Sequence, residues 1–113
     1  MLAKDHRLSK KDIELLFKQG EGFRTPFVFF RTRPTNIPRA RFCIIFTKTV
    51  KMTSIERNRI RRLTYGVLQK YLEKFRTHRD YAVTITPKLI EQPQKKRREI
   101  LEQSLTPLLS LHG

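Results

Sequence analysis

Features that point to several common classes of protein are scarce in this sequence. There is one cysteine, Cys43, so an internal disulfide and a cysteine-rich zinc site are both excluded. No apolar run approaches the roughly 18 residues that a membrane-spanning helix needs. The N-terminus is charged from Lys4 onward and lacks the apolar segment of a signal peptide. We therefore expect a soluble, cytoplasmic protein that does not bind membranes.

Acidic residues are scarce as well. The chain has 113 residues, with 25 Lys and Arg against 10 Asp and Glu, which gives a net charge of +15. This length is typical of a single domain, here residues 1–113, and 38% hydrophobic residues are enough for a modest core. So large a positive charge destabilises a fold by self-repulsion unless a polyanion relieves it, and nucleic acid is the usual one.

The excess positive charge lies in the middle of the chain. Between Gly22 and Leu72 a single acid, Glu56, interrupts the basic residues. These basic residues are Arg24, Arg31, Arg33, Arg39, Arg41, Lys48, Lys51, Arg57, Arg59, Arg61, Arg62 and Lys70. The same segment is rich in phenylalanine, whereas a disordered basic tail lies at a chain end and lacks aromatic residues. We therefore assign the charge to folded structure.

The sequence does not contain the groupings that catalysis by the chain itself requires. A nuclease needs clustered carboxylates that hold metal ions, or a histidine acid–base pair. The N-terminal acids are scattered, and the three histidines have neither metal-ligand spacing nor an evident partner. No Gly-rich phosphate loop or nucleophile motif occurs, and Cys43 lies in an apolar run typical of a buried residue. We predict no catalytic residue, no metal ligand and no cofactor held by protein side chains.

The N-terminal half predicts a helix followed by strands. Ser9 and Asp12 resemble a capping box that opens a helix, and Gly20 is a suitable residue for its end. Residues 26–32 are rich in Phe and Val, which favours a strand. One face of that strand carries Phe27, Phe29 and Arg31, and the other carries Val28, Phe30 and Thr32. The apolar run 42–46 is typical of a central strand that is buried on both faces.

The C-terminal half predicts a long helix, a strand and a last helix. Ser54 is a suitable cap for a helix over about residues 55–75. Within it, Gly66 either costs about 1 kcal/mol relative to alanine or marks a close approach. Residues 81–86 alternate as a strand.

The last helix begins near Gln94, and Pro107 is expected to kink it or to end its regular part. The order of elements predicts an α+β fold, a small α/β sandwich in which three helices pack on a mixed sheet of three to four strands.

The most informative segment starts the long helix, at residues 56–64. Four arginines and one asparagine share its exposed arc, namely Arg57, Asn58, Arg59, Arg61 and Arg62. Guanidinium groups bind phosphate through two hydrogen bonds, and the N-terminal end of a helix also favours phosphate. A solvated charged face is the alternative. Such a face normally alternates in sign, whereas this one places like charges one turn apart at a cost in stability.

The run Arg57-Asn58-Arg59 followed by Ile60-Arg61-Arg62 resembles the "RNR" signature of the bacterial ribonuclease P protein subunit. The similarity covers roughly residues 6–110 and keeps its other parts in order. These parts are the opening His6-Arg7-Leu8-Ser9, the apolar strand after Arg41, the basic turn Thr47-Lys48, and the late strand at 80–85.

The resemblance implies an accessory subunit of a ribonucleoprotein whose RNA performs the cleavage. In that family the holoenzyme removes the 5′ leader of precursor tRNA, and Mg2+ ions act in the RNA active site. The implied partners are ribonuclease P RNA and precursor tRNA, with a monomeric protein in a 1:1 complex with the RNA. The implied fold contains a left-handed β-α-β crossover formed by residues 42–46, the long helix and residues 81–86, an exception to the general right-handed preference.

The resemblance also implies site residues, carried over position by position. The RNA-binding set is Lys48, Lys51, Arg57, Asn58, Arg59, Arg61, Arg62 and Tyr65. The set for a cleft that holds the single-stranded leader is Ile13, Phe17 and Phe30. Exposed aromatic rings stack on unpaired bases, and ordinary core packing is the alternative for Phe17 and Phe30.

The sequence departs from the family pattern at a few positions. Tyr65 and Gly66 follow the arginine motif where the family usually has a basic residue and often an acid, Thr49 replaces a second lysine, and Cys43 replaces a frequent glycine. We expect Tyr65 to replace a phosphate contact with stacking.

The main alternative is a structural RNA-binding protein, such as a small ribosomal protein, that uses the same basic helix without a cleavage partner. Stimulation of precursor tRNA processing at low magnesium separates the two. A DNA-binding module is less favoured, because no helix-turn-helix or zinc-finger pattern is present. A membrane-surface helix is also less favoured, because the flanking strands imply that its apolar face is buried.

Overall fold

The computed structural model describes residues 6–47, 49 and 51–112. Its helices are α1 (Lys10–Gln19), α2 (Ser54–Lys70), α3 (Pro87–Ile90) and α4 (Gln94–His112), and a short 3-10 turn covers Leu72–Lys74. Its strands are β1 (Glu21–Arg24), β2 (Val28–Pro34), β3 (Ala40–Phe46) and β4 (Arg79–Ile85). The predicted α+β class is confirmed, and α3 is a further short helix that the sequence analysis did not predict.

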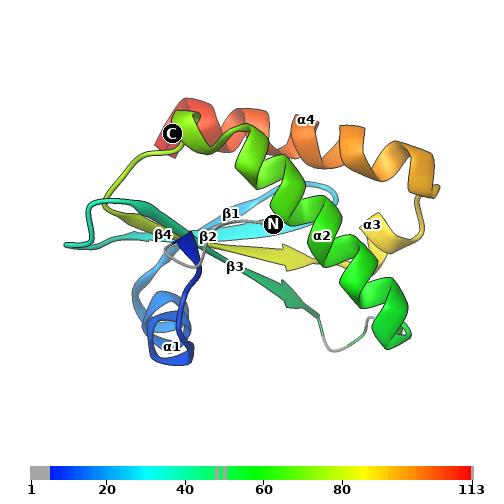
Figure 1. The fold of residues 1–113 in the computed structure, drawn as a ribbon, viewed down its shortest axis with the longest axis horizontal. Helices are drawn as coiled ribbons and strands as arrows, with labels where there is room; N and C mark the ends of the chain where they lie inside the picture. The colour runs from blue at the N-terminus through cyan, green and yellow to red at the C-terminus, as the bar shows by residue number, and fades with distance from the viewer. Residues whose placement is uncertain (1–5, 48, 50, 113) are drawn as a thin grey trace.

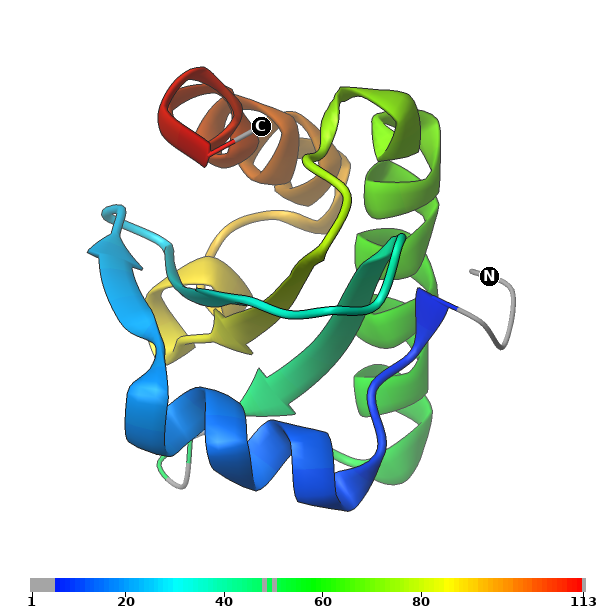
Figure 2. The same ribbon diagram turned by 90° about the vertical axis from the view of Figure 1, so that its left-hand side faces the viewer.

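The strands form one mixed sheet in the order β1-β2-β4-β3. β2 is antiparallel to both β1 and β4, whereas β3 and β4 are parallel. In Figure 1 both parallel strands run to the right, β4 lies above β3, and α2 crosses in front of them; Figure 2 confirms that α2 lies on that side of the sheet. This arrangement is a left-handed crossover, as the resemblance implied, and it departs from the usual right-handed connection.

Helices cover both faces of the sheet (Figure 2), with α1 on one face and α2 and α4 on the other. The period-two alternation of β2 decides which side chain meets which layer. Val28, Phe30 and Thr32 are buried on the face under α2 and α4, and Phe29, Arg31 and Arg33 are half-buried on the α1 face. The two predicted faces are therefore confirmed for residues 28–32, whereas Phe27 precedes β2 and packs against the main core.

The main core lies between the sheet and the helices α2 and α4. At its centre the Phe42 ring stacks on Tyr81 at 5.4 Å and meets the edge of Phe75 at 4.9 Å between ring centroids. The helices contribute buried aliphatic side chains, namely Ile60, Val67, Leu68, Leu101, Leu105 and Leu108. A smaller core lies under α1 and contains Leu16, Cys43 and Ala82. Most of the apolar burial, and hence most of the hydrophobic stabilisation, is on the α2 and α4 side.

The expectation that residues 42–46 form a central strand is wrong, because β3 lies at the edge of the sheet. The strand is nevertheless covered on both faces, which explains its continuous apolar run. Its outer edge is partly covered too, since Arg7 forms a parallel bridge with Phe42 and the Leu8 N–H donates to the Phe42 carbonyl at 3.1 Å. The interior strands are β2 and β4, and the residues of β4 alternate between the two cores.

The ends of the long helix differ slightly from the prediction. Thr53, not Ser54, is the cap, and its hydroxyl oxygen accepts a hydrogen bond from the Glu56 N–H at 3.2 Å. The helix ends at Lys70, and the residues up to Phe75 form the 3-10 turn and its exit. A Cβ added at Gly66 meets no atom within 4 Å, so this glycine does not mark a close approach between the described parts of the chain.

The last helix begins at Gln94 as predicted. It runs through Pro107 to His112, so the proline does not end it. Its first turn contains no acidic residue.

Candidate RNA interface

The arginine-rich segment forms the first turns of α2, and its side chains divide between two flanks. Beside the end of β3, Arg57 and Arg61 both lie over the ring of Phe46, with guanidinium carbons 5.5 and 5.3 Å from the ring centroid. Arg61 also donates from Nη1 to Oδ1 of Asn58 at 3.3 Å. Both arginines are half-buried. Packing on the ring therefore restricts their guanidinium groups before any RNA binds, which lowers the entropic cost of binding.

The other flank of α2 is more exposed. Ile55, Asn58, Arg59 and Arg62 follow one another at i, i+3, i+4 and i+7 and line a hollow of about 330 Å3. Asn58, Arg59 and Arg62 are all exposed, so their polar groups are accessible to phosphate. The predicted motif thus presents guanidinium groups on two sides of one helix.

A groove of about 700 Å3 opens at the end of the sheet where β2 begins and β4 ends. Phe29 and Thr84, which pair across β2 and β4, line it from the same side of the sheet as α1. Arg24 of β1 and Lys88 of α3 also line the groove. The groove therefore has an aromatic ring, two cations and one acid, Glu91, in its lining, and the ring and the cations suit a polyanion that carries flat bases.

Cations and rings alternate from this groove toward α1, and we call Arg24, Phe29, Arg31 and Phe17 the stacking strip. The guanidinium carbon of Arg24 is 5.4 Å from the centroid of Phe29, and that of Arg31 is 5.6 Å from Phe29 and 5.4 Å from Phe17. Arg31 is held in place by a hydrogen bond from Nη1 to the Gly20 carbonyl at 3.2 Å. Phe17 is 40% exposed. Such flat surfaces stack on unpaired bases with little demand on sequence.

A sequence model of the Ribonuclease P family matches residues 2–109 of this chain. The chain belongs to the ribonuclease P family. It is the protein subunit of ribonuclease P, an endoribonuclease complex of tRNA processing, and ribonuclease P RNA is its partner. The alternative of a structural RNA-binding protein without a cleavage partner is not favoured.

Solved structures of ribonuclease P proteins have the same fold. An RNase P protein mutant from Staphylococcus aureus, described as defective in mRNA degradation activity, aligns with a TM-score of 0.81 and 19% identity over 93% of this chain and 89% of that chain. The RNase P protein from Thermotoga maritima aligns with a TM-score of 0.68 and 18% identity over 94% of each chain. No curated protein sequence matches. At identities this low the alignments show a shared fold only, so the residues of the site are assigned from the geometry of this chain.

The residues expected to form the leader cleft of this ribonuclease P protein are divided between the two faces of the sheet. Phe17 is exposed on α1, and Ile13 is half-buried against the smaller core. Phe30 is 1% exposed and packs in the main core, on the face of the sheet that α1 does not cover. For Phe30 the alternative of ordinary core packing is therefore correct. Phe29 faces the groove instead. The period-two alternation of the strand, which puts Phe29 and Phe30 on opposite faces, could have identified Phe29 as the exposed ring.

The remaining residues of the predicted RNA-binding set have mixed surroundings. Lys51 is exposed just before α2, and Lys48 lies outside the described residues. Tyr65 is half-buried against the main core, and this burial raises the pKa of its hydroxyl. Because Tyr65 is neutral and half-buried, only the exposed part of its ring is available to stack on a base. Its contact with RNA stays a prediction.

Some basic residues of the ribonuclease P protein serve the fold. Asp80 is fully buried and accepts hydrogen bonds from Nε and Nη2 of Arg41 at 2.8 and 2.9 Å, while Nη1 of Arg41 donates to Asp12 at 3.1 Å. The hydrogen bond to Asp80 raises the pKa of Arg41, and a hydrogen bond from Ser9, followed by the charge of Arg41, lowers the pKa of Asp12. This network joins α1 to β3 and β4, so it positions Phe17. No local sequence pattern marks Asp80 as the partner of Arg41, because the two residues are 39 positions apart.

Two features of the described residues bear on metal binding and nucleophilic chemistry. Among them, no three His, Cys, Asp or Glu side chains lie close enough to hold a metal ion. Cys43 is buried in the smaller core, and burial raises the pKa of its thiol to about 12, so it stays protonated at neutral pH. No helix in the described ranges has the length and apolar character needed to cross a bilayer.

Proposed function

We propose that this ribonuclease P protein holds the single-stranded 5′ leader of precursor tRNA on the stacking strip while α2 binds ribonuclease P RNA. The observation that carries the proposal is the alternation of Phe17, Arg31, Phe29 and Arg24 beside the groove. Unpaired bases have lost their stacking partners, and rings and guanidinium planes replace them. The cations next to each ring neutralise the phosphates that join those bases.

In this proposal the protein contributes affinity and position, and the RNA contributes the chemistry. Mg2+ ions required for cleavage are held by the RNA, and no protein ligand takes part. The protein acts as a monomer in a 1:1 complex with ribonuclease P RNA in the cytoplasm. Its high positive charge lowers the repulsion between the RNA enzyme and an RNA substrate, so the effect of the protein is largest at low salt and low magnesium.

The first experiment asks whether the chain assists cleavage at all. The full-length protein is added to a bacterial ribonuclease P RNA with precursor tRNA at low Mg2+, and 5′ processing is measured. We expect processing to be stimulated. If the protein binds the RNA and processing does not increase, the accessory role fails.

The second experiment tests the stacking strip in the reconstituted holoenzyme. Phe17→Ala is expected to weaken binding of precursor tRNA by about tenfold or more, since one base stacked on an aromatic ring contributes about 1–3 kcal/mol. Affinity for mature tRNA is expected to stay unchanged, because mature tRNA has no leader. Phe17→Trp keeps a ring and should retain wild-type affinity, whereas Phe17→Leu keeps only apolar bulk and should behave like the alanine variant. Equal losses for precursor and mature tRNA contradict the proposal, and so does equal behaviour of the Trp and Leu variants.

A further inference from the structure

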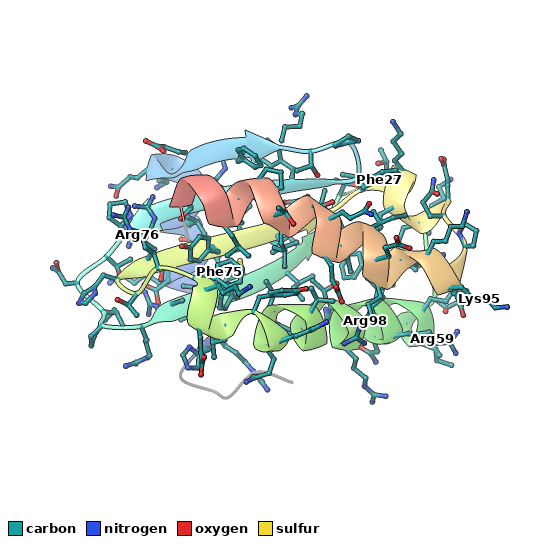
Figure 3. All side chains as sticks on the ribbon, turned by 90° about the horizontal axis from the view of Figure 1, so that it is seen from above. Phe27, Arg59, Phe75, Arg76, Lys95 and Arg98 are labelled. Carbon is teal, nitrogen blue, oxygen red and sulfur yellow. The ribbon has the colours of Figure 1, made fainter. Side chains whose placement is uncertain are left out.

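A second cluster of basic residues lies away from the stacking strip. Four basic residues follow one another in the first turns of α4, namely Lys95, Lys96, Arg97 and Arg98. Figure 3 shows Lys95 and Arg98 at the same end of the molecule as Arg59 of α2, with Arg76 at the opposite end. α2 and α4 pack against each other. The exposed flank of the arginine motif and the start of α4 therefore lie at the same end of the molecule, and we call Arg59, Arg62, Lys95, Lys96 and Arg98 the basic surface.

The fold uses only part of this cluster. Arg97 donates from Nε to the Gln92 carbonyl at 3.0 Å and from Nη2 to the Ile90 carbonyl at 2.6 Å, so it fixes the connection between α3 and α4. Arg98 is more exposed and forms an ion pair with Glu102 at 3.5 Å. Lys95 and Lys96 are exposed, and neither ammonium group has an ion-pair or hydrogen-bond partner among the residues that the structure describes.

The two lysines also oppose the preference of a helix terminus. The first turn of a helix favours acids because its dipole is positive there, and cations at this position reduce stability. The first turns of α1 and α2 each contain an acid, whereas that of α4 contains none. Residues that break a local rule without a gain for the fold are expected where function requires them.

The composition of the surface indicates which form of RNA it fits. Among the described phenylalanines and tyrosines only Phe17 is exposed, and it lies on α1, on the other side of the sheet from α2 and α4. The residues of the basic surface are themselves cations without rings, and the half-buried rings of Phe46 and Tyr65 lie toward the other flank of α2, beside Arg61. A paired RNA keeps its bases stacked inside the helix and presents phosphates and sugar hydroxyls outside, so cations alone are sufficient to bind it.

We propose that Lys95, Lys96 and Arg98 of α4, together with Arg59 and Arg62 of α2, bind the phosphate backbone of paired RNA while the stacking strip holds a single strand. The proposal rests on the RNA-binding role proposed above, and it adds α4 to that role. The protein then lies between two RNA segments of different form, a single strand on the α1 side and a duplex on the α2 and α4 side.

The test compares two double variants of the full-length protein that lose the same charge. Lys95→Ala/Lys96→Ala removes two cations from the proposed surface. Lys74→Ala/Arg76→Ala removes two exposed cations near the other end of α2, where Figure 3 places Arg76. Binding of an RNA duplex of about 16 base pairs, and of one of its strands alone, is measured over a range of salt concentrations.

We expect Lys95→Ala/Lys96→Ala to weaken duplex binding by about tenfold and to reduce the slope of log K against log salt by up to about 2, because up to two phosphate contacts are lost. Single-strand binding should change by no more than about twofold, the general effect of lower net charge, and so should duplex binding by the control variant. Unlabelled single strand should not displace the duplex. The melting temperature of the α4 variant should be unchanged or higher, because the lysines oppose the helix dipole.

Each other outcome has a definite meaning. If the two double variants bind the duplex with equal affinity, the proposal that the start of α4 binds paired RNA is wrong. It is also wrong if single strand and duplex compete for one site. A lower melting temperature for the α4 variant assigns the lysines to the fold instead. If the wild-type protein binds neither RNA, the proposed function is wrong, and so is the proposal that the start of α4 binds paired RNA.

Discussion

The two faces of the sheet are filled in different ways. Under α2 and α4 the side chains are large and apolar, and the aromatic rings of Phe42, Phe75 and Tyr81 contact one another. Under α1 the apolar core is small, Asp80 and Arg41 form a buried ion pair beside it, and the rest of the face opens into the groove. Hydrophobic stabilisation is thus concentrated on one face of the sheet. The other face can therefore expose rings and cations that a packed core would have to cover.

The largest effect that tests this comparison comes from two neighbouring phenylalanines. Phe30→Ala removes a ring from the main core and is expected to lower the free energy of unfolding by about 3–5 kcal/mol. Phe29→Ala removes a half-buried ring from the α1 face and should cost less than half as much, while weakening single-strand RNA binding by about tenfold. Urea denaturation followed by circular dichroism measures the first quantity, and a fluorescence binding assay measures the second. Equal losses of stability mean that the two faces do not differ as described.

The second prediction concerns the polar part of the α1 face. Asp80→Asn leaves the guanidinium of Arg41 with Asp12 as its remaining carboxylate, so we expect the free energy of unfolding to fall by about 3 kcal/mol. A double-mutant cycle with Arg41→Gln measures the coupling, and the double variant should lose less than the sum of the single variants. A loss below about 1 kcal/mol for Asp80→Asn contradicts a structural role for this network.

The smallest effect concerns Gly66 on the exposed side of α2. An added methyl group meets no atom within 4 Å, so Gly66→Ala should raise the free energy of unfolding by about 1 kcal/mol through helix propensity alone. Thermal unfolding of the free protein checks this. A loss of stability means that the glycine is needed by the fold, whereas a gain in stability accompanied by weaker RNA binding indicates that RNA approaches the helix closely at this position.

Local patterns predicted the features of the fold that depend on neighbours in sequence. The alternation of β2 separated Phe29 from Phe30 because side chains on a strand point to opposite faces. The spacing of Arg57 and Arg61 placed both on one flank because a helix repeats every 3.6 residues. Ser9 was predicted as the cap of α1, and its side chain accepts the Asp12 N–H.

Features that depend on tertiary contacts were not predictable in this way. The apolar run of β3 indicates that both faces of the strand are buried. It does not indicate whether the strand has a neighbouring strand on each side or, as here, lies at the edge of the sheet beside an N-terminal segment. β1 was not predicted because it has only four residues, one of which is Gly22, and glycine has little strand preference. In the structure a Cβ added at Gly22 would lie 2.9 Å from the Phe29 ring, so the glycine makes room for that ring. Arg41 and Asp80 are 39 residues apart, and only the register of β3 against β4 brings them together.

The position of β4 has a consequence for the synthesis of the protein. β4 is the last strand made, yet it lies between β2 and β3, which follow each other in the chain without being neighbours in the sheet. A nascent chain that ends before Arg79 has synthesised the whole arginine helix but has no continuous sheet to support it. Folding on the ribosome therefore has to wait until Ile85 has left the exit tunnel. A product of premature termination before that point carries most of the positive charge without the surface that gives the charge its specificity.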